Sequence, residues 1–342
     1  MTPTRLAATL LAIAIAIVAA ACGGSGGDAT SASSASSASA APTDITLSYD
    51  WPTVDFPAVP IAVAQEKGWF DEQGLKVNLI FPPDPASSAK VLATGKSNLA
   101  LLTTTDVVFA AKSGLPVRSI GNYTVENNWG LFAMPGTPLS IDDLKGKSIS
   151  TFGDSWTNAM LPFVLKAAGL TDKDVKEVVV DEDLPLLLNG KVDIITDLTS
   201  YIVPGVQEET GKDPEYLLAK DYGAPNAPVW VWAGNADWLQ GNAEAAKGFM
   251  AAMGKATEWA CANADEATTI FEKAYPDNGA SHAYNLGGWT DNCKYMKNAD
   301  GTYFTQTDAQ WTGLAEALQG AGQLEKVEAP SVYYTNEYLP QG

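Results

Sequence analysis

Residues 44–81 read DITLSYDWPTVDFPAVPIAVAQEKGWFDEQGLKVNLIF, and this stretch decides the expected fold. Apolar and polar residues alternate over Ile45–Tyr49, which predicts a strand. Ala58–Lys67 has the pattern of a helix that Gly68 ends, and Lys76–Phe81 predicts a second strand. Strand, helix and strand in this order predict a βαβ unit with two parallel strands.

The same alternation of strands and helices continues along the chain. Further strands are expected at residues 99–102, 117–120, 148–152, 175–180, 192–197 and 229–234. About 300 residues follow the first strand's start, which is more than one hydrophobic core usually serves. We therefore predict an α/β fold with two lobes, each a mostly parallel sheet flanked by helices. Lobe I comprises residues 44–130 and 235–342, lobe II comprises 131–234, and two crossover segments lie near 128–133 and 229–235.

The N-terminal residues are typical of a secretory signal peptide. A positive charge at Arg5 precedes the apolar run Leu6–Ala21, which is shorter than the roughly 20 residues that span a membrane. The small residues before Cys22 resemble a bacterial lipobox, so we expect residues 1–21 to be removed and Cys22 to carry lipid. Plain secretion with an incidental cysteine is the alternative. Residues 22–43 are rich in Gly, Ser and Ala, which predicts a flexible linker on the extracytoplasmic face of the cell membrane.

Charge and cysteine content narrow the range of partners. The chain has 40 acidic and 21 basic residues, a net charge of -19, which argues against nucleic acid and anionic membrane surfaces as partners. If Cys22 is lipidated, Cys261 and Cys293 are left as a pair in an oxidising compartment. A disulfide bond between them is the simplest interpretation.

Several short motifs of this chain resemble the solute-binding proteins of the thiamin-pyrimidine and sulfonate uptake family. They are Asp50 and Trp51, Val63–Phe70, Gly74 and Leu75, Pro83–Pro85, Gly95 and Lys96, Asp106, Gly114–Val117, Leu144–Lys147, Ala167–Leu170 and Leu186–Asp193. The resemblance implies a type II periplasmic binding protein, which closes two lobes on a small solute and docks on an ABC permease with its ATPase. We expect a monomer.

The resemblance is closest to the branch that takes up the thiamin pyrimidine precursor. That branch usually has Asn and then His shortly after the Trp, whereas this chain continues with Pro52 to Asp55. Since the resemblance is nevertheless closest to this branch, a thiamin-precursor aminopyrimidine is the first expectation for the solute. A sulfonate, taurine, nitrate or riboflavin-like solute is the alternative.

Ligands of open α/β sheets bind beyond the carboxyl ends of the strands. The residues expected there are aromatic, hydroxylic or acidic: Asp50, Trp51, Phe56, Asp84, Thr104, Tyr123 and Asn127 in lobe I, and Ser155, Trp156, Asp197 and Tyr201 in lobe II. After the signal peptide the sole arginine is Arg118, at the start of a strand, so the guanidinium that commonly binds oxyanions is not expected at the site. Acidic and aromatic side chains favour a flat ligand with amino groups, such as an aminopyrimidine.

Other patterns favour structural roles. Asp106 is expected to cap a helix, and Trp230 and Trp232 to pack in the core or a crossover. The acidic run Asp181–Asp183 lacks the spacing of a calcium loop. The single histidine, His282, has no catalytic motif around it, so we expect no enzyme, no cofactor and no metal. A lipoprotein that senses a ligand for a membrane kinase is a second class of function, and a pyrimidine-forming enzyme is a third.

Overall fold

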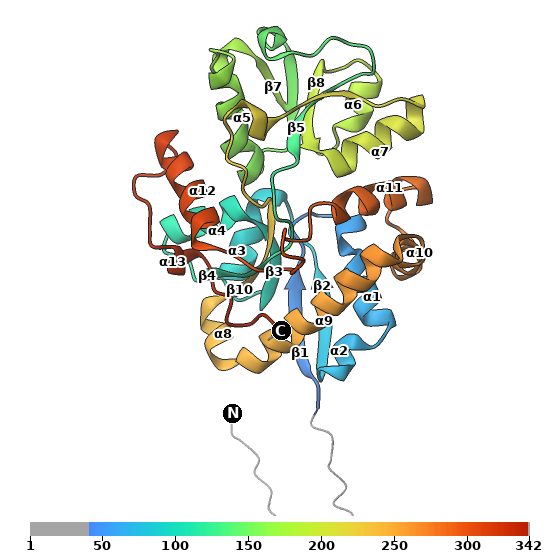
Figure 1. The fold of residues 1–342 in the computed structure, drawn as a ribbon, viewed down its shortest axis with the longest axis vertical. Coiled ribbons are helices and arrows are strands. Elements are labelled where there is room, and N and C mark those ends of the chain that lie inside the picture. The colour runs from blue at the N-terminus through green and yellow to red at the C-terminus, as the bar shows by residue number, and fades with distance from the viewer. Residues whose placement is uncertain (1–40, 341–342) are drawn as a thin grey trace, which may run out of the picture. The chain divides into compact units, whose positions relative to one another are not determined.

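A computed structural model describes residues 41–340, which belong to one compact unit (Figure 1). These residues contain two five-stranded sheets. The first sheet has the order β2 (Leu75–Ile80), β1 (Thr43–Ser48), β3 (Leu99–Thr103), β10 (Trp230–Asn235) and β4 (Val117–Asn122). The second has the order β7 (Lys176–Val179), β6 (Ser148–Thr151), β8 (Ile194–Leu198), β5 (Trp129–Ala133) and β9 (Glu215–Leu218).

The two sheets are built in the same way. In each, three neighbouring strands pair in parallel, and one strand of opposite direction lies between the third and the edge strand. That opposite strand is β10 in the first sheet and β5 in the second. Four of the five strands in each sheet therefore share one direction, which confirms the predicted α/β class with mixed, mostly parallel sheets.

Helices flank both sheets (Figure 1). Those that follow the strands of the first sheet are α1 (Val59–Glu66), α2 (Trp69–Glu72), α3 (Ser88–Ala93) and α4 (Thr104–Lys112). Those that follow the strands of the second are α5 (Ser155–Ala167), α6 (Leu184–Leu188) and α7 (Thr199–Thr210). Short 3-10 helices lie at Phe56–Ala58, Pro85–Ser87, Ile141–Asp143, Asp172–Asp174 and Ala219–Tyr222.

The C-terminal third is mostly helical. It forms α8 (Ala236–Gly241), α9 (Ala243–Ala262), α10 (Ala264–Ala274), α11 (His282–Cys293), α12 (Asp308–Gly320) and α13 (Pro330–Tyr333). Helix α9 packs against α1 and α2, beside the first sheet, whereas α11 packs on α7 of the second (Figure 1). The sulfur atoms of Cys261 in α9 and Cys293 in α11 lie 2.08 Å apart as a disulfide bond, the pair that the sequence predicts.

Both segments expected as crossovers are themselves strands. Residues 128–133 contain β5, and residues 229–235 contain β10, each buried in the middle of its sheet. The chain instead passes between the sheets through the segment after Asn122 and the segment that precedes Trp230. The apolar run of each segment pairs on both sides and so satisfies its backbone groups within a sheet. The lobe boundaries themselves stay a prediction.

Local sequence explains where the helices begin and end. Gly68 adopts φ 70°, a left-handed conformation that favours glycine, directly after α1. Helix α4 begins at Thr104, because Thr103 is its N-cap and Asp106 completes a capping box. Asp106 therefore supports the cap from inside the first turn and is not the N-cap itself.

The predicted signal peptide, residues 1–21, the lipid site Cys22 and nearly all of the linker 22–43 lie outside the described residues. Within residues 41–340 no helix is both long and apolar enough to cross a membrane.

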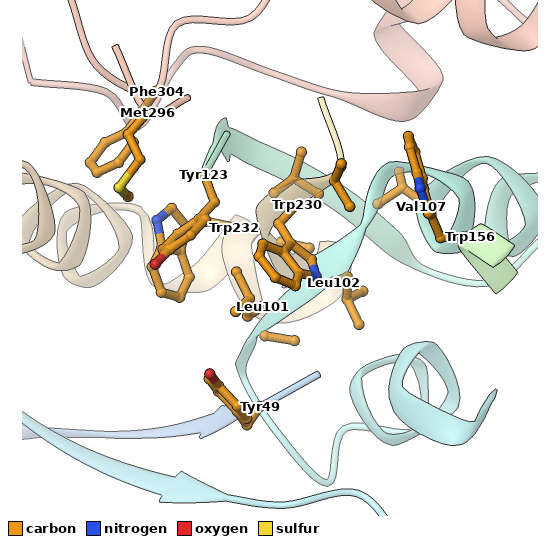
Figure 2. Close-up of a cluster of buried hydrophobic side chains, with 14 of the residues drawn as sticks. Tyr49, Leu101, Leu102, Val107, Tyr123, Trp156, Trp230, Trp232, Met296 and Phe304 are labelled. Carbon is orange, nitrogen blue, oxygen red and sulfur yellow. The ribbon is translucent and has the colours of Figure 1, made fainter. Parts of the chain in front are cut away.

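A cluster of large buried side chains lies around β10 of the first sheet. Figure 2 shows Trp232 and Tyr123 in contact, with Phe304 and Met296 beside them. The rings of Tyr123 and Trp232 meet edge to face at a centroid distance of 5.4 Å. Trp232 is fully buried, as expected of a core residue. This cluster is a rigid support for the strand ends that carry the candidate site.

Candidate functional site

A cavity of about 270 Å³ opens where the parallel strands of both sheets have their carboxyl ends. Its lining residues are mostly aromatic or acidic: Tyr49, Asp50, Trp51, Asp55, Pro85, Leu101, Thr103, Asp106, Trp129, Phe152, Asp154, Trp156, Thr157, Asp181, Glu182, Asp183, Leu184, Pro185, Asp197, Leu198, Tyr201, Ile202, Val229, Trp230 and Tyr284. The first sheet and the second sheet both contribute. A cavity of this kind, with polar groups converging on apolar walls, is the usual form of a small-molecule site.

Strand direction explains why these residues meet. Asp50 and Thr103 lie at the carboxyl ends of β1 and β3, and Asp197 lies near the carboxyl end of β8. Strands β10 and β5 run the opposite way, so their first residues, Trp230 and Trp129, lie beside these carboxyl ends. The cavity thus collects the ends of the parallel strands and the starts of the two antiparallel ones.

The cavity is strongly acidic. Eight of its lining residues are Asp or Glu, and none is Lys, Arg or His. Burial raises the pKa of Asp50, and the nearby carboxyl of Asp106 raises it further. Burial and then the carboxyl of Asp183 likewise raise the pKa of Asp197. Carboxyls that are desolvated and close to one another resist ionisation until a positive charge arrives.

Hydrogen bonds hold one carboxyl, Asp55, between the two sheets. The hydroxyl of Tyr201 in α7 donates to Asp55 Oδ2 at 2.7 Å, and the hydroxyl of Tyr49 donates to Oδ1. Burial raises the pKa of Asp55 to about 6, although both hydroxyls lower it. Because Asp55 follows β1 and Tyr201 follows β8, the Tyr201 hydrogen bond joins the two halves of the cavity.

A second hydrogen-bonded contact joins the halves at Asp106. Ser155 Oγ, at the start of α5, donates to Asp106 Oδ1 at 2.6 Å and lies 3.0 Å from the hydroxyl of Thr103. Thr103 itself donates to Asp106 Oδ2 at 2.8 Å. Both oxygens of Asp106 are thus occupied by protein donors, so this carboxyl positions the wall and has little capacity left for a ligand.

Aromatic rings form the remaining walls. Trp51 after β1 meets Phe152 after β6 edge to face, with centroids 4.9 Å apart. Trp230 Nε1 donates to Asp50 Oδ2 at 3.1 Å, which fixes both side chains. Figure 2 shows Trp230 above Leu101 and Tyr49, and Trp156 beside Val107. Flat rings on several sides suit a flat ligand.

Two polar atoms of the lining have no hydrogen-bond partner within residues 41–340. They are Asp183 Oδ2 and Trp156 Nε1. Asp183 is 6% exposed and Trp156 is 2% exposed. Burial raises the pKa of Asp183 to about 7. A buried polar atom without a partner costs free energy, so these two atoms mark places where a ligand or water is accommodated.

The structure brings five of the eleven predicted ligand residues to the cavity: Asp50, Trp51, Trp156, Asp197 and Tyr201. Ser155 reaches it indirectly through Asp106. Their roles toward a ligand stay predictions.

The other five lie away from the cavity wall. Tyr123 is buried and donates to the carbonyl of Pro57 at 2.8 Å. Asn127 donates to the carbonyl of Pro225 and Thr104 to that of Pro228, so both tie backbone segments together. Phe56 is buried against the ring of Tyr201 at 4.5 Å, and Asp84 is exposed.

Sequence reasoning did not single out several lining residues. Asp55 was visible as the extra acidic residue in the loop after the first strand, and Asp183 as part of an acidic run after another strand. Trp230 is expected to pack in the core or a crossover. Nothing in the sequence indicates that its strand is antiparallel, and this direction is what brings Trp230 to the cavity. Tyr284 comes from α11, whose position beside α7 no local pattern indicates.

His282 and the acidic side chains, for which we expect no catalytic or metal-binding role, can also be placed. His282 is exposed at the start of α11, where its ring nitrogens lie 3.0 Å from Glu272 and 3.3 Å from Asp265. It does not line the cavity. Within the described part of the chain no group of His, Cys, Asp and Glu side chains has the arrangement of a metal site.

Solved structures of other proteins share this fold. One is the periplasmic aliphatic sulphonate binding protein SsuA from Escherichia coli, 13% identical with a TM-score of 0.66, covering 88% of this chain and 94% of that chain. Another is the periplasmic nitrate-binding protein NrtA from Synechocystis, 16% identical with a TM-score of 0.64, covering 87% of each. At such identities the likeness concerns the fold alone, and the fold is that of the periplasmic binding proteins.

The chain belongs to the NMT1/THI5-like family, which matches residues 56–267. A Haemophilus influenzae protein whose name assigns it to thiamine biosynthesis is 28% identical over 84% of this chain and 90% of its own. The formylaminopyrimidine-binding protein of Halalkalibacterium halodurans is 29% identical over 61% of this chain and 64% of its own. A synthase of 4-amino-5-hydroxymethyl-2-methylpyrimidine phosphate from Saccharomyces cerevisiae, THI5, is 24% identical over 64% and 67%. The family thus contains proteins named as binders and proteins named as synthases.

Proposed function

We propose that this protein is the extracytoplasmic solute-binding subunit of an ABC importer and that it captures an aminopyrimidine related to the thiamin precursors. The observation that carries the proposal is the acidic and aromatic cavity between the two sheets. Aromatic walls suit a flat ring, and carboxyl groups suit its amino substituents. The family relationship to a formylaminopyrimidine-binding protein supports the same class of ligand.

A sulfonate or nitrate is less well matched to the cavity. Its lining contains no Lys, Arg or His. Arg118 lies in β4, where its Nε donates to the carbonyl of Tyr334. An oxyanion would lie among carboxyls without a cationic partner, which is electrostatically unfavourable. The fold shared with SsuA and NrtA therefore does not carry their ligands over to this chain.

Binding rather than synthesis fits the residues at the cavity. No histidine or cysteine lines it, and the disulfide pair lies between α9 and α11. The carboxyls, hydroxyls and indoles of the lining can hold a ligand by hydrogen bonds. The synthase names in the family make turnover of the ligand the measurement that separates the two functions.

In the proposed mechanism two lobes close on the solute by a hinge motion and open when the protein docks on its permease. The contacts of Tyr201 with Asp55 and of Ser155 with Asp106 join the lobes in the closed form. Removal of residues 1–21 and lipid on Cys22 would place the protein at the outer face of the membrane. A linker of about 20 residues would then keep it near the permease.

Three measurements test the proposal. Calorimetric titration with aminopyrimidines, sulfonates and nitrate should give binding by an aminopyrimidine alone, and tighter binding of a sulfonate would overturn the ligand class. Incubation with the bound aminopyrimidine should leave it unchanged, since chemical conversion would make the protein an enzyme. Small-angle scattering should show compaction on saturation, and an unchanged radius of gyration would contradict the closing lobes.

The choice between import and sensing needs a partner. Reconstituted permease and ATPase should hydrolyse ATP faster when the ligand-loaded protein is added. Stimulation of a membrane kinase with no effect on the ATPase would support the sensing alternative.

A further inference from the structure

The open polar atoms of the cavity constrain the charge of the ligand. Asp183 Oδ2 has no partner within residues 41–340, and the side chain of Asp183 is almost fully buried. Its neighbour at the cavity is Asp197, whose Oδ1 accepts a hydrogen bond from the backbone N–H of Leu198 at 2.7 Å. Both carboxyls lie on the side of the cavity that the second sheet forms. The charge of Asp183 raises the pKa of Asp197, so ionising both carboxyls is electrostatically costly.

No protein cation balances this pair. The lining of the cavity contains no Lys, Arg or His, although it contains six further carboxyls. Hydrogen bonds from protein groups occupy both oxygens of Asp55 and of Asp106, so those two carboxyls are already committed. Asp183 Oδ2 has no donor within residues 41–340, and Asp197 Oδ1 accepts from the backbone N–H of Leu198, so both carboxyls can accept from a ligand and together compensate one positive charge.

The cavity also presents a donor. Trp156 lines it, is 2% exposed, and its Nε1 has no partner within residues 41–340. An indole N–H can only donate. A ligand that fills the cavity without leaving this atom unpaired therefore needs an acceptor as well as donors.

We propose that the ligand is bound as a cation, whose N–H groups donate to Asp183 and Asp197 while an acceptor atom of its ring accepts from Trp156. The inference rests on the proposed function only in taking this cavity as the ligand site, and it goes further in fixing the charge. A cationic aminopyrimidine meets all three requirements, because it retains an unprotonated ring nitrogen. Its neutral counterpart supplies the hydrogen bonds but leaves the two carboxyls uncompensated.

Two matched pairs of probes test the proposal by calorimetric titration at pH 7.5. The first pair is 4-amino-5-aminomethyl-2-methylpyrimidine, a cation, and its neutral 5-hydroxymethyl counterpart. The second pair, outside the pyrimidines, is 3-(aminomethyl)pyridine, a cation that keeps an unprotonated ring nitrogen, and neutral 3-(hydroxymethyl)pyridine. We expect each cation to bind roughly ten- to a hundredfold more tightly than its neutral partner, the ratio expected when a charge-assisted hydrogen bond to a buried carboxyl is gained.

Variants locate the effect. Asp183→Asn should weaken binding of the cation roughly ten- to a hundredfold and weaken binding of the neutral probe, which loses a hydrogen bond but no charge pairing, clearly less. Asp142→Asn removes the same charge from an exposed position between β5 and β6. This variant should leave both affinities unchanged. Circular dichroism of each variant shows whether it is folded, and Asp197→Asn is the second variant if Asp183→Asn is not.

The outcomes separate this inference from the proposed function. Equal or tighter binding of the neutral probes overturns the cation, while the aminopyrimidine function stands if the hydroxymethyl compound binds. Binding of 3-(aminomethyl)pyridine without binding of either pyrimidine supports the cation and overturns the pyrimidine class. Equal losses in Asp183→Asn for charged and neutral probes also overturn the cation, because Asp183 would then act by shape. If no cation binds, the proposal is wrong.

Discussion

Replacing Asp183 by Asn is expected to stabilise the ligand-free protein above pH 7. Burial raises the pKa of this carboxyl from 3.8 to about 7. The folded state therefore holds the proton more tightly than the unfolded state does, and stability is lost as the pH rises toward 7 and through it. Each pH unit between the two pKa values corresponds to about 1.4 kcal/mol, so the loss has a ceiling of about 4 kcal/mol.

Asn keeps the shape of the protonated carboxyl but has no charge to lose. It can also accept from the backbone N–H of Leu184, the group that partly offsets the burial of Asp183. The substitution further removes the neighbouring charge that raises the pKa of Asp197. The gain should therefore be about 4 kcal/mol at pH 8 and fall to about 1.6 kcal/mol at pH 5, where the unfolded carboxyl is ionised but the folded one is still protonated.

Urea unfolding of ligand-stripped protein at pH 5 and pH 8 measures this difference. The wild-type protein should lose free energy of unfolding between the two pH values, and Asp183→Asn should lose less. Asp142→Asn, at an exposed position, is the control for the change in net charge. The reasoning fails if Asp183→Asn is no more stable than the wild-type protein at pH 8, because a buried, unbalanced carboxylate would then have no cost.

Three further predictions concern the walls and the helical region. Tyr201→Phe removes the donor to Asp55, so the ligand-free protein should lose about 1 kcal/mol of stability and show a larger radius of gyration by scattering. Trp51→Ala should weaken ligand binding by about 1 to 3 kcal/mol in a calorimetric titration if the indole stacks on the ligand. Replacing Cys261 and Cys293 by Ser should lower the free energy of unfolding by about 3 to 4 kcal/mol, since the disulfide closes a loop with a sequence separation of 32.

Matched controls accompany these variants. Tyr284→Phe alters another tyrosine of the cavity wall and should leave the radius of gyration unchanged. Trp238→Ala removes a half-buried indole of α8 outside the cavity and should leave the affinity unchanged. If Tyr284→Phe opens the protein as much as Tyr201→Phe does, the hydrogen bond to Asp55 is not the contact that holds the lobes. Mass spectrometry of the unreduced protein shows whether the two cysteines are bonded, and free thiols would contradict the pairing.

The strands of the parallel units were predictable because their patterns are local. Ile45–Tyr49 and Lys76–Phe81 agree with β1 and β2 to within two residues at each end, since alternation and turn residues act over a few positions. Helix α7 and strand β9 were not predicted. Helix α7 contains Pro204, which ordinarily argues against a helix interior, and β9 has only four residues, too few for a pattern.

Candidate residues at the ends of the predicted parallel strands were found from the sequence for the same reason. Asp50, Trp51 and Asp197 lie at or beside the carboxyl ends of their strands, where the general rule for open sheets places ligand residues. Phe56 and Tyr123 obey the same rule in sequence but turn into the core. The rule predicts at which end of the strands ligand residues lie, but it does not predict the direction in which a side chain points.

Local patterns in the sequence are sufficient to predict the alternation of strands and helices, the acidic strand ends and the scarcity of arginine. The antiparallel direction of β5 and β10, which brings Trp129 and Trp230 to the cavity, is visible in the folded chain alone. Which carboxyls are occupied likewise depends on the fold, since Asp55 meets Tyr201 across 146 positions of the chain. Hydrophobic patterns specify which face of a strand is buried, whereas strand direction and contacts between distant segments depend on how the whole chain packs.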